Sequence, residues 1–491
     1  MTEIIDLFAG PGGLGEGFSS FTNDNEKPFK IKISIEKESF AYKTLSLRAF
    51  YRQFKTVPKE YYQYVRGEIS IDDLFSKYPE QAACIKNEVH QIELGSEDFP
   101  HNEVMKKINQ QVVNPKNSII IGGPPCQAYS LAGRAKMAKN ENFESDPRHT
   151  LYLEYLKIIA DINPAVFVME NVKGILSSKL NGEYIFDKIL DDIKIPSKVK
   201  KPTKKKFNKN ETYSIYSLAI DKDPSELKRE DFIIKSEEYG IPQCRHRVIL
   251  LGIRNDINIK PNTLEKQAKI ISCKDVINDL PKIRSGLSKG EDTLKIWREK
   301  ILSKFPTAKI GNNLSRGSEF LKYNTVRTPT IYKEWFFDEK LNGVLNHVSK
   351  SHMDSDLHRY YYMSSLAKKN NISPKLHDLP TELLPKHKNV MNAVKSRALF
   401  NDRFKVQIAD KPATTITSHI AKDGHYFIHY DPSQCRSLTV REAARIQTFP
   451  DNYKFEGPKT SQYQQVGNAV PPLLAYQIAN IVHELLRTSI I

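Results

Sequence analysis

The stretch from Ile119 to Gln127 constrains the fold of this chain more than any other, because it predicts a buried strand that ends abruptly. Three isoleucines lead into Gly122-Gly123-Pro124-Pro125, and the prolines lack N–H donors and have a fixed φ, so the strand cannot continue. The loop then presents a single thiol, that of Cys126. Ligands and chemistry gather at the carboxyl edge of an open α/β sheet. We therefore predict an α/β fold with a candidate reactive cysteine, the alternative being a cysteine that only packs in the core.

Charge and cysteine content narrow the class of protein. Lys plus Arg number 74 against 58 for Asp plus Glu, so the formal net charge is +16, which favours a polyanionic partner such as nucleic acid. The five cysteines form no C-x-x-C pair, so we expect neither a disulfide framework nor a metal site. Neither a signal peptide nor a run of 18 apolar residues is found, which favours an intracellular protein without membrane contact.

The first 36 residues predict a nucleotide-type binding unit. A strand at 3–8 runs into a glycine turn at 9–15 and then into an amphipathic segment. The glycines match G-x-G-x-x-G, which keeps a dinucleotide-dependent oxidoreductase among the alternatives. A second strand at 31–35 ends in Glu36, and an acid at this position is typical of sites that hold ribose hydroxyls.

Further charged side chains follow predicted strands. Residues 51–113 form an insertion of short helices with a third strand near its end, where either Glu88 or Glu93 faces the cofactor. The strand at 165–169 delivers Glu170 to the same edge as Cys126 if the sheet is parallel. Arg245 and Arg247 alternate at strand spacing, which predicts that both lie on one face and point at the same anion.

The sequence as a whole predicts three regions. Residues 1–260 form an α/β domain that carries the candidate reactive cysteine and the nucleotide-type binding unit, with insertions at about 51–113 and at 194–210, the second being rich in lysine. From 261 to 405 the apolar periodicity fragments and aromatic residues lie among basic ones, which suits a nucleic-acid surface or the core of a smaller domain. Residues 406–491 regain clear helical signals, including the capping box of Thr439 and Glu442.

Taken together, these blocks resemble the C5 cytosine-specific DNA methyltransferase family. The blocks occur in the family's order and span nearly the whole chain; they are Asp6–Gly13, Glu36, Pro124–Gln127, Glu170–Val172, Gln243–Arg247, Arg441–Pro450 and Gly467–Pro471. The resemblance implies a Rossmann-like S-adenosyl-methionine-dependent methyltransferase domain. In this resemblance residues 1–260 are the catalytic and cofactor-binding domain, 261–405 are a target-recognition domain, and 406–491 return to complete the catalytic domain. The two insertions depart from the family pattern.

The resemblance implies that the glycine turn holds S-adenosyl-methionine. Phe8 would lie near the adenine, Glu36 would bind the ribose hydroxyls, and Asn468 would complete the pocket. The full set of expected cofactor-binding residues is Asp6, Phe8, Ala9, Gly10, Gly12, Gly13, Glu36, Pro124, Asn468 and Val470.

The chemistry of the reaction explains the expected catalytic residues. Cytosine C5 is a poor nucleophile until a thiolate adds to C6, which assigns Cys126 as the nucleophile. Glu170 would hydrogen-bond the base and donate a proton, and Arg245 would favour the thiolate. Arg247 and Gln127 complete the expected set. The target base must leave the duplex stack, at a cost of a few kcal/mol.

The predicted function is therefore methylation of C5 in a specific duplex DNA sequence by a bacterial modification enzyme. We expect a monomer that acts at the nucleoid in the cytoplasm, with a restriction endonuclease for the same site as a potential partner. Methylation of RNA is an alternative, because a tRNA-modifying branch shares these blocks, but the large region at 261–405 speaks against it. An oxidoreductase would not need Cys126, Glu170 and Arg245 together.

Overall fold

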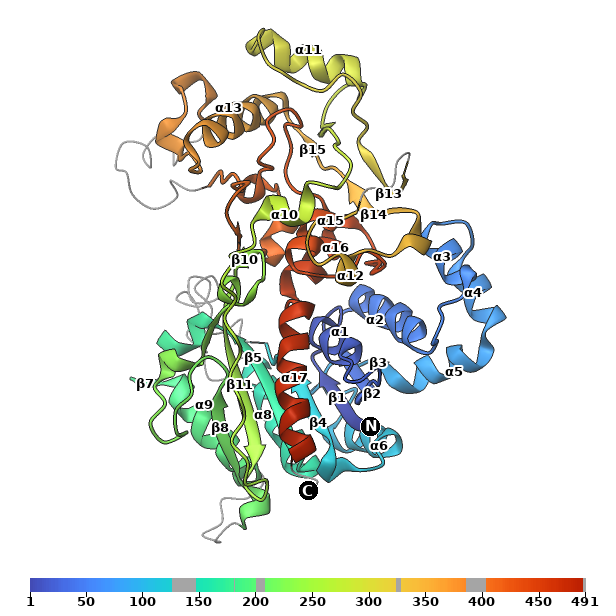
Figure 1. The fold of residues 1–491 in the computed structure, drawn as a ribbon, viewed down its shortest axis with the longest axis vertical. Coiled ribbons are helices and arrows are strands. Elements are labelled where there is room, and N and C mark those ends of the chain that lie inside the picture. The colour runs from blue at the N-terminus through green and yellow to red at the C-terminus, as the bar shows by residue number, and fades with distance from the viewer. Residues whose placement is uncertain (126–146, 181, 200–207, 324–327, 386–402, 489–491) are drawn as a thin grey trace.

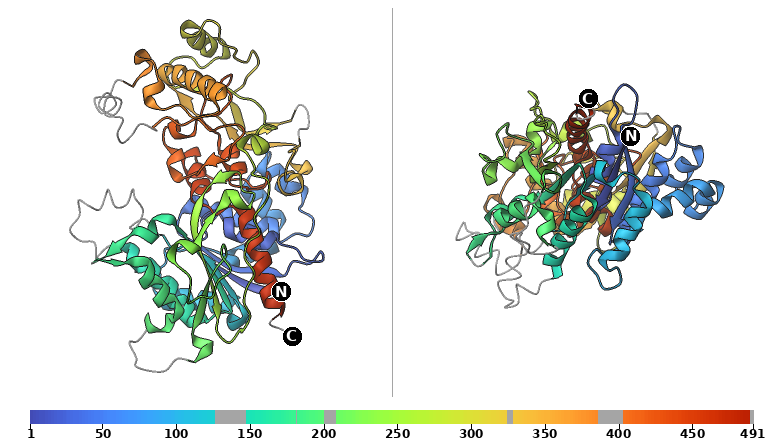
Figure 2. Two further views of the ribbon diagram at one scale, coloured as in Figure 1. Left: turned by 60° about the vertical axis from the view of Figure 1, so that its left-hand side comes forward. Right: turned by 90° about the horizontal axis from the view of Figure 1, so that it is seen from below.

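The computed structural model describes residues 1–125, 147–180, 182–199, 208–323, 328–385 and 403–488, which form two parts (Figure 1). One part holds a large sheet flanked by helices, and the other holds α11 (Leu294–Lys304), α13 (Asp354–Asn370) and short strands. Helices α15 (Val440–Ile446) and α16 (Lys459–Asn468) lie between the two parts in both side views (Figures 1 and 2).

The sheet has eight strands, seven of them in the order β3-β2-β1-β4-β5-β11-β8, with β9 paired to β11. The first five strands of this order are parallel, so their carboxyl ends share one edge. Strand β11 is antiparallel to β5, β8 and β9. The bounds are β1 Thr2–Leu7, β2 Phe29–Glu36, β3 Val89–Gln91, β4 Ile119–Gly122, β5 Val166–Val172, β8 Tyr213–Ser217, β9 Ile233–Lys235 and β11 His246–Arg254.

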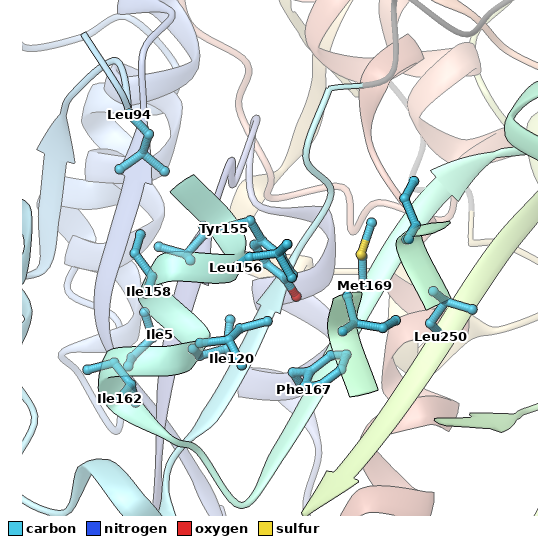
Figure 3. Packing of buried hydrophobic residues seen from close by; sticks show 14 of the residues in the cluster. Ile5, Leu94, Ile120, Tyr155, Leu156, Ile158, Ile162, Phe167, Met169 and Leu250 are labelled. Atoms are coloured by element: carbon cyan, nitrogen blue, oxygen red, sulfur yellow. The ribbon is translucent and has the colours of Figure 1, made fainter. Parts of the chain in front are cut away.

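Both faces of the sheet are covered, which explains why its strands read as continuous apolar runs. Along β1, Ile4 and Ile5 are both fully buried but belong to clusters on opposite faces. Figure 3 shows one cluster, in which Ile120 and Phe167 of the sheet lie beside Tyr155 of α8. This face is covered by α6 (His101–Gln111), α8 (Pro147–Ile162) and α9 (Ile185–Lys194), and the other by α1 (Gly13–Ser20) and α17 (Pro472–Thr488).

The insertion at 51–113 contains the short helices and the third strand that the sequence predicts. Helices α3 (Lys59–Val65), α4 (Ile71–Lys77) and α5 (Pro79–Glu88) precede β3, and α6 follows it. Helix α5 packs against α2 (Ser39–Arg52), while α3 and α4 extend along the molecule toward the second part (Figure 1).

The second part is built around small sheets. Strands β13 (Gly317–Lys322) and β14 (Gly343–Val348) are antiparallel, and β12 (Gly286–Leu287) pairs with β15 (Ser351–His352). Helix α11 packs against α13. Among the described residues, the other α-helices of this part are α10 (Cys273–Ile277) and the short α12 (Lys333–Phe336).

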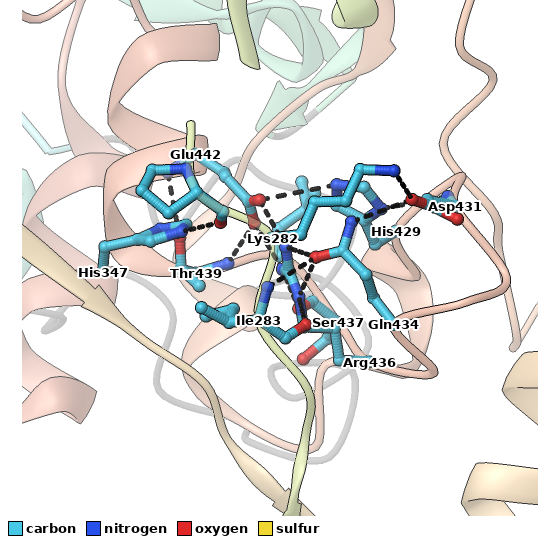
Figure 4. A network of polar contacts seen from close by, with 12 residues as sticks. Lys282, Ile283, His347, His429, Asp431, Gln434, Arg436, Ser437, Thr439 and Glu442 are labelled. Carbon is cyan, nitrogen blue, oxygen red and sulfur yellow. Dashed lines mark hydrogen bonds and ion pairs between the residues drawn. The ribbon is translucent and has the colours of Figure 1, made fainter. Parts of the chain in front are cut away.

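The segment after residue 406 contacts both parts of the molecule. Helix α15 packs against β14 and α10, whereas α17 packs along α1. A buried polar network fixes the start of α15 (Figure 4). Arg436 binds both carboxylate oxygens of Glu442 at 2.6 Å, and His347 contacts the Thr439 hydroxyl at 2.9 Å. Burial alone would raise the pKa of Glu442, but Arg436 and His429 hold it well below its ordinary value.

Candidate active site

A cavity of about 520 Å³ opens at the carboxyl edge of the parallel strands. The ends of three strands contribute Asp6, Glu36 and Glu170 to its wall. Helix α16 contributes Gln464 and Asn468 to the same wall. This is the edge at which a parallel α/β sheet binds its ligands.

Nine of the ten residues expected to bind the cofactor line this cavity. The exception is Gly12, which has a φ of 95° and caps the start of α1. A Cβ on Gly12 would lie 2.8 Å from Leu45 Cδ2 and 2.9 Å from the Tyr453 hydroxyl. Gly12 therefore serves the shape of the turn, since a side chain fits neither the conformation nor the space.

The glycine turn is held to the second strand and to the C-terminal segment. The Gly10 N–H donates to Glu36 Oε2 at 2.8 Å. A Cβ on Gly13 would lie 2.2 Å from the carbonyl oxygen of Val470, so this close approach requires glycine. Burial raises the pKa of Glu36, while hydrogen bonds from Glu38 and Gly10 oppose that shift.

Asp6 places a buried carboxyl group in the cavity wall. Its side chain is 1% exposed, and neither carboxylate oxygen has a hydrogen-bond partner among the described residues. Burial raises its pKa to about 8; Arg52 opposes this shift, and the carboxylates of Glu36 and Glu88 add to it. Asp6 can therefore hold a proton at neutral pH and can present a charge to a cationic ligand.

A further acid of the cavity wall is Glu93. It lines the wall, where Lys37 forms an ion pair with it at 3.1 Å. Glu88 instead pairs with Arg52 at 2.6 Å and does not line the cavity. Of the two alternatives left open by the sequence, only Glu93 is in a position to contact a ligand there.

Glu170 is oriented by an arginine on the neighbouring antiparallel strand. Arg247 Nε lies 2.9 Å from Glu170 Oε1, and both side chains are largely buried. A Cβ on Gly123 would lie 3.1 Å from Glu170 Oε2, so the loop after β4 passes directly over this carboxylate. Burial lowers the pKa of Arg247, and the charge of Glu170 opposes that shift.

Arg245 differs from the expected strand geometry. It lies between β10 (Gln243–Cys244) and β11, so it does not alternate with Arg247 along one strand. Its Nη1 donates to the carbonyl oxygens of Ile416 at 2.8 Å and Gly467 at 3.3 Å. Burial lowers the pKa of Arg245 well below its ordinary value, and the charge of Arg247 lowers it further. The charge of Glu170 opposes these shifts, so Arg245 lies within electrostatic reach of that carboxylate while its hydrogen bonds hold two C-terminal segments together.

Two of the expected catalytic residues, Cys126 and Gln127, lie outside the described residues, as does the lysine-rich run at 200–207. Pro125, the residue before Cys126, lines the cavity together with Gly123 and Pro124. Within the part of the chain that the structure covers, no group of three or more His, Cys, Asp or Glu side chains could hold a metal ion.

The sequence from 89 to 484 matches the model of the family described as C-5 cytosine-specific DNA methylase. The chain belongs to this family. Type II methyltransferase M.Bpa9945I of Bacillus paralicheniformis is 34% identical over 508 aligned residues, which cover 99% of each chain. Type II methyltransferase M.DdeI of Desulfomicrobium norvegicum is 27% identical, with 97% of this chain and 87% of the relative covered.

A solved structure has the same fold as this C-5 cytosine-specific DNA methylase. It is described as a "putative DNA modification methyltransferase encoded within prophage", and its source is Escherichia coli. The two structures superpose with a TM-score of 0.54 at 19% sequence identity, over 99% of this chain and 100% of the other. This likeness confirms the Rossmann-like methyltransferase fold. The family match confirms a C5 cytosine DNA methyltransferase over the RNA-modifying and oxidoreductase alternatives.

The cavity of this methylase includes residues that the sequence did not single out. Those on the C-terminal segment are Ser418, Ser461, Gln464 and Gln465, and others, such as Lys37 and Ala41, lie nearer the N-terminus. Gln464 and Asn468 are exposed and one helical turn apart on α16, so the i, i+4 spacing could have identified Gln464. Ser418 follows no such pattern, because only tertiary packing brings its segment against α16. Among the described residues, no helix is both long and apolar enough to cross a membrane.

Proposed function

We propose that this protein transfers a methyl group from S-adenosyl-methionine to C5 of a cytosine in a specific duplex DNA sequence. In this proposal it is the modification enzyme of a bacterial restriction–modification system. One observation carries the proposal: Glu170 and nine expected cofactor-binding residues line a single cavity. The type II methyltransferase relatives support the biological role.

The chemistry of the cavity fits S-adenosyl-methionine. Asp6, whose two oxygens have no hydrogen-bond partner in the described part of the chain, suits the positively charged end of this cofactor. Glu36 and Glu93 offer carboxylates for hydroxyl and amino groups, and Phe8 offers an aromatic surface. Gly13 leaves room only for backbone against Val470. The bound cofactor would supply an electrophilic methyl group.

The residues beside the cofactor cavity suit a cytosine that has left the duplex. In the proposed mechanism the Cys126 thiolate adds to C6, and the bond is broken again when the C5 proton leaves. Glu170 holds N3 and the amino group of the base and donates a proton as C6 is attacked. Arg247 fixes Glu170 through their 2.9 Å contact, so the carboxyl group is positioned before the base arrives.

Transfer of tritiated methyl groups from S-adenosyl-methionine tests the proposed function. We expect incorporation into duplex DNA but not into RNA, and loss of incorporation in Cys126→Ala. Cys84→Ala is the matched control, because Cys84 is an exposed thiol on α5 outside the cavity. Full activity of Cys126→Ala would remove this thiol from the mechanism.

Duplex DNA that contains 5-fluorocytosine tests the covalent step separately. The fluorine at C5 cannot leave as a proton does, so we expect a trapped protein–DNA complex that survives denaturing electrophoresis. An active enzyme that forms no such complex would exclude thiolate addition.

Further aspects of the proposal concern partners and location. We propose a monomer that acts on the chromosome in the bacterial cytoplasm, beside a restriction endonuclease with the same target sequence. Light scattering on the purified protein checks the monomer, and sequencing of methylated DNA gives the target sequence that such a nuclease would cut.

A further inference from the structure

The insertion helices α3 and α4 connect the cofactor-binding part to the second part of the molecule. Tyr61, Tyr62 and Leu74 of the insertion are buried in one apolar cluster with Leu341 and Leu345 of the second part. The same cluster contains residues of α2, which borders the cofactor cavity through Ala41. The insertion therefore shares one core with both parts.

Three polar contacts reinforce this apolar packing. The Tyr62 hydroxyl donates to Asp338 Oδ2 at 2.8 Å, across 276 positions of sequence. The Tyr64 hydroxyl donates to Glu456 Oε1 at 2.9 Å. The Arg66 side chain donates to the carbonyl oxygen of Lys340 at 3.4 Å. Hydrogen bonds to charged groups are the stronger ones, so the Tyr62 contact is well suited to fix this junction.

The Tyr62–Asp338 contact continues as a chain of partly and fully buried hydrogen bonds to α1, the helix that follows the glycine turn. Asn452 Nδ2 donates to the same Asp338 oxygen at 2.8 Å, and Arg48 Nη1 donates to Asn452 Oδ1 at 3.0 Å. Arg48 Nε donates to Glu16 Oε2 at 2.8 Å. Glu16 lies in the first turn of α1, the helix that the glycine turn begins.

A parallel contact ends on the glycine turn itself. Tyr453, the neighbour of Asn452, donates its hydroxyl proton to the carbonyl oxygen of Pro11, which lines the cavity. The guanidinium of Arg48 lies over the Tyr51 ring at 3.9 Å and near the Tyr453 ring at 4.9 Å. Movement of Asp338 is thus resisted by groups that also shape the cofactor cavity.

We propose that the insertion is a strut that fixes the distance between residues 261–405 and the cofactor cavity, with Tyr62 and Asp338 as positioning residues. The inference rests on the proposed function, because it assumes that residues 261–405 contact DNA while the cavity holds the cofactor. DNA must meet both surfaces at once, and a pre-set distance lowers the ordering cost of binding. Since the chain of contacts reaches the glycine turn, DNA and cofactor each strengthen the binding of the other.

The substitution Tyr62→Phe removes the hydroxyl that crosses the junction and keeps the buried ring. We expect KM for duplex DNA to rise about fivefold while kcat changes less than about twofold, because the chemical groups stay in place. The matched control is Tyr78→Phe, whose hydroxyl donates to Glu60 at 2.9 Å within the insertion. The control is expected to keep the wild-type KM. Equal KM values in Tyr62→Phe and wild type would overturn the strut.

The cofactor dissociation constant, measured with and without duplex DNA carrying the sequenced target, separates positioning from general destabilisation. In wild type we expect DNA to tighten cofactor binding. In Tyr62→Phe and in Asp338→Asn we expect the DNA-free constant to be kept and the gain from DNA to be reduced. If DNA tightens cofactor binding in both variants as much as in wild type, the inference is contradicted, while the proposed methyltransferase function is unaffected. Wild-type protein that methylates no DNA would instead contradict the proposed function.

Discussion

The carboxyl group of Asp6 is buried in the cavity wall, where its ionisation carries a large free-energy cost. A buried carboxylate without a partner is costly, so the group is expected to stay protonated until a cation arrives. The strand places it there, and a Cβ on Gly15 of α1 would lie only 2.8 Å from its Oδ2. The cost of ionising Asp6 lowers the free energy of unfolding, which can be measured directly as a function of pH.

The pH dependence of stability is expected to reveal Asp6. Its pKa rises from 3.8 to about 8 on folding, so between these values the native state binds a proton that the unfolded state has lost. Stability therefore falls as pH rises through this window, by on the order of 4 kcal/mol from this group. Denaturant unfolding of wild type and Asp6→Asn from pH 4 to 8 measures the effect. The variant should match wild type near pH 4 and exceed it near pH 8; parallel curves would contradict the prediction.

Glu170→Gln tests the proposed proton donor. The amide retains the shape of the side chain but cannot transfer a proton, so we expect kcat to fall by about 10²- to 10³-fold. The cofactor dissociation constant, measured by calorimetry, should stay unchanged. Glu93→Gln is the opposing control, since Glu93 lies in the cavity wall without contacting Glu170 through any described bond. The Glu93→Gln variant should bind the cofactor more weakly and keep the wild-type kcat. The opposite result in the two variants would assign proton donation to Glu93 and cofactor binding to Glu170.

At the scale of elements, the close approach of α1 to the C-terminal segment shapes the cavity. Gly13→Ala places a methyl group 2.2 Å from the Val470 carbonyl oxygen, so one element must move. We expect weaker cofactor binding and a stability loss of about 1 to 3 kcal/mol, typical of overpacking. Gly67→Ala is the control, because its Cβ meets open space and only its φ of 79° resists the change. It should lose some stability but keep cofactor affinity. Unaltered affinity in Gly13→Ala would show that the segments can separate freely.

The elements that the sequence predicted correctly are those whose signals are local. The strand ending in Gly122 follows from its isoleucines and glycines, and α15 follows from the capping box of Thr439 and Glu442. The position of Arg245 could not be predicted in this way, because the carbonyl groups of Ile416 and Gly467 that hold it lie 171 and 222 positions away. The proposed role of the insertion could not be predicted from the sequence either, because Asp338, which accepts a hydrogen bond from Tyr62, lies 276 positions away.

At the scale of the whole molecule, the net charge of +16 predicts a strong dependence of DNA binding on salt. Each phosphate contact releases counterions, so KM for DNA should rise by about tenfold or more between 50 and 200 mM salt. Cofactor affinity should change far less, because its contacts lie in a cavity. Initial rates over a salt series, with calorimetry of the cofactor alone, measure both. A KM that is independent of salt would exclude an electrostatic DNA interface.

The contacts between the C-terminal segment and the N-terminal glycine turn affect how the protein folds during synthesis on the ribosome. Val470 and Asn468 line the same cavity as Asp6 and Phe8, although they are synthesised more than 450 residues later. Nascent chains tend to fold from the N-terminus onward. The glycine turn therefore stays partly exposed until the C-terminal segment has been synthesised, near the end of translation. An interrupted chain would therefore lack a finished cofactor cavity, and unfinished copies would be inert.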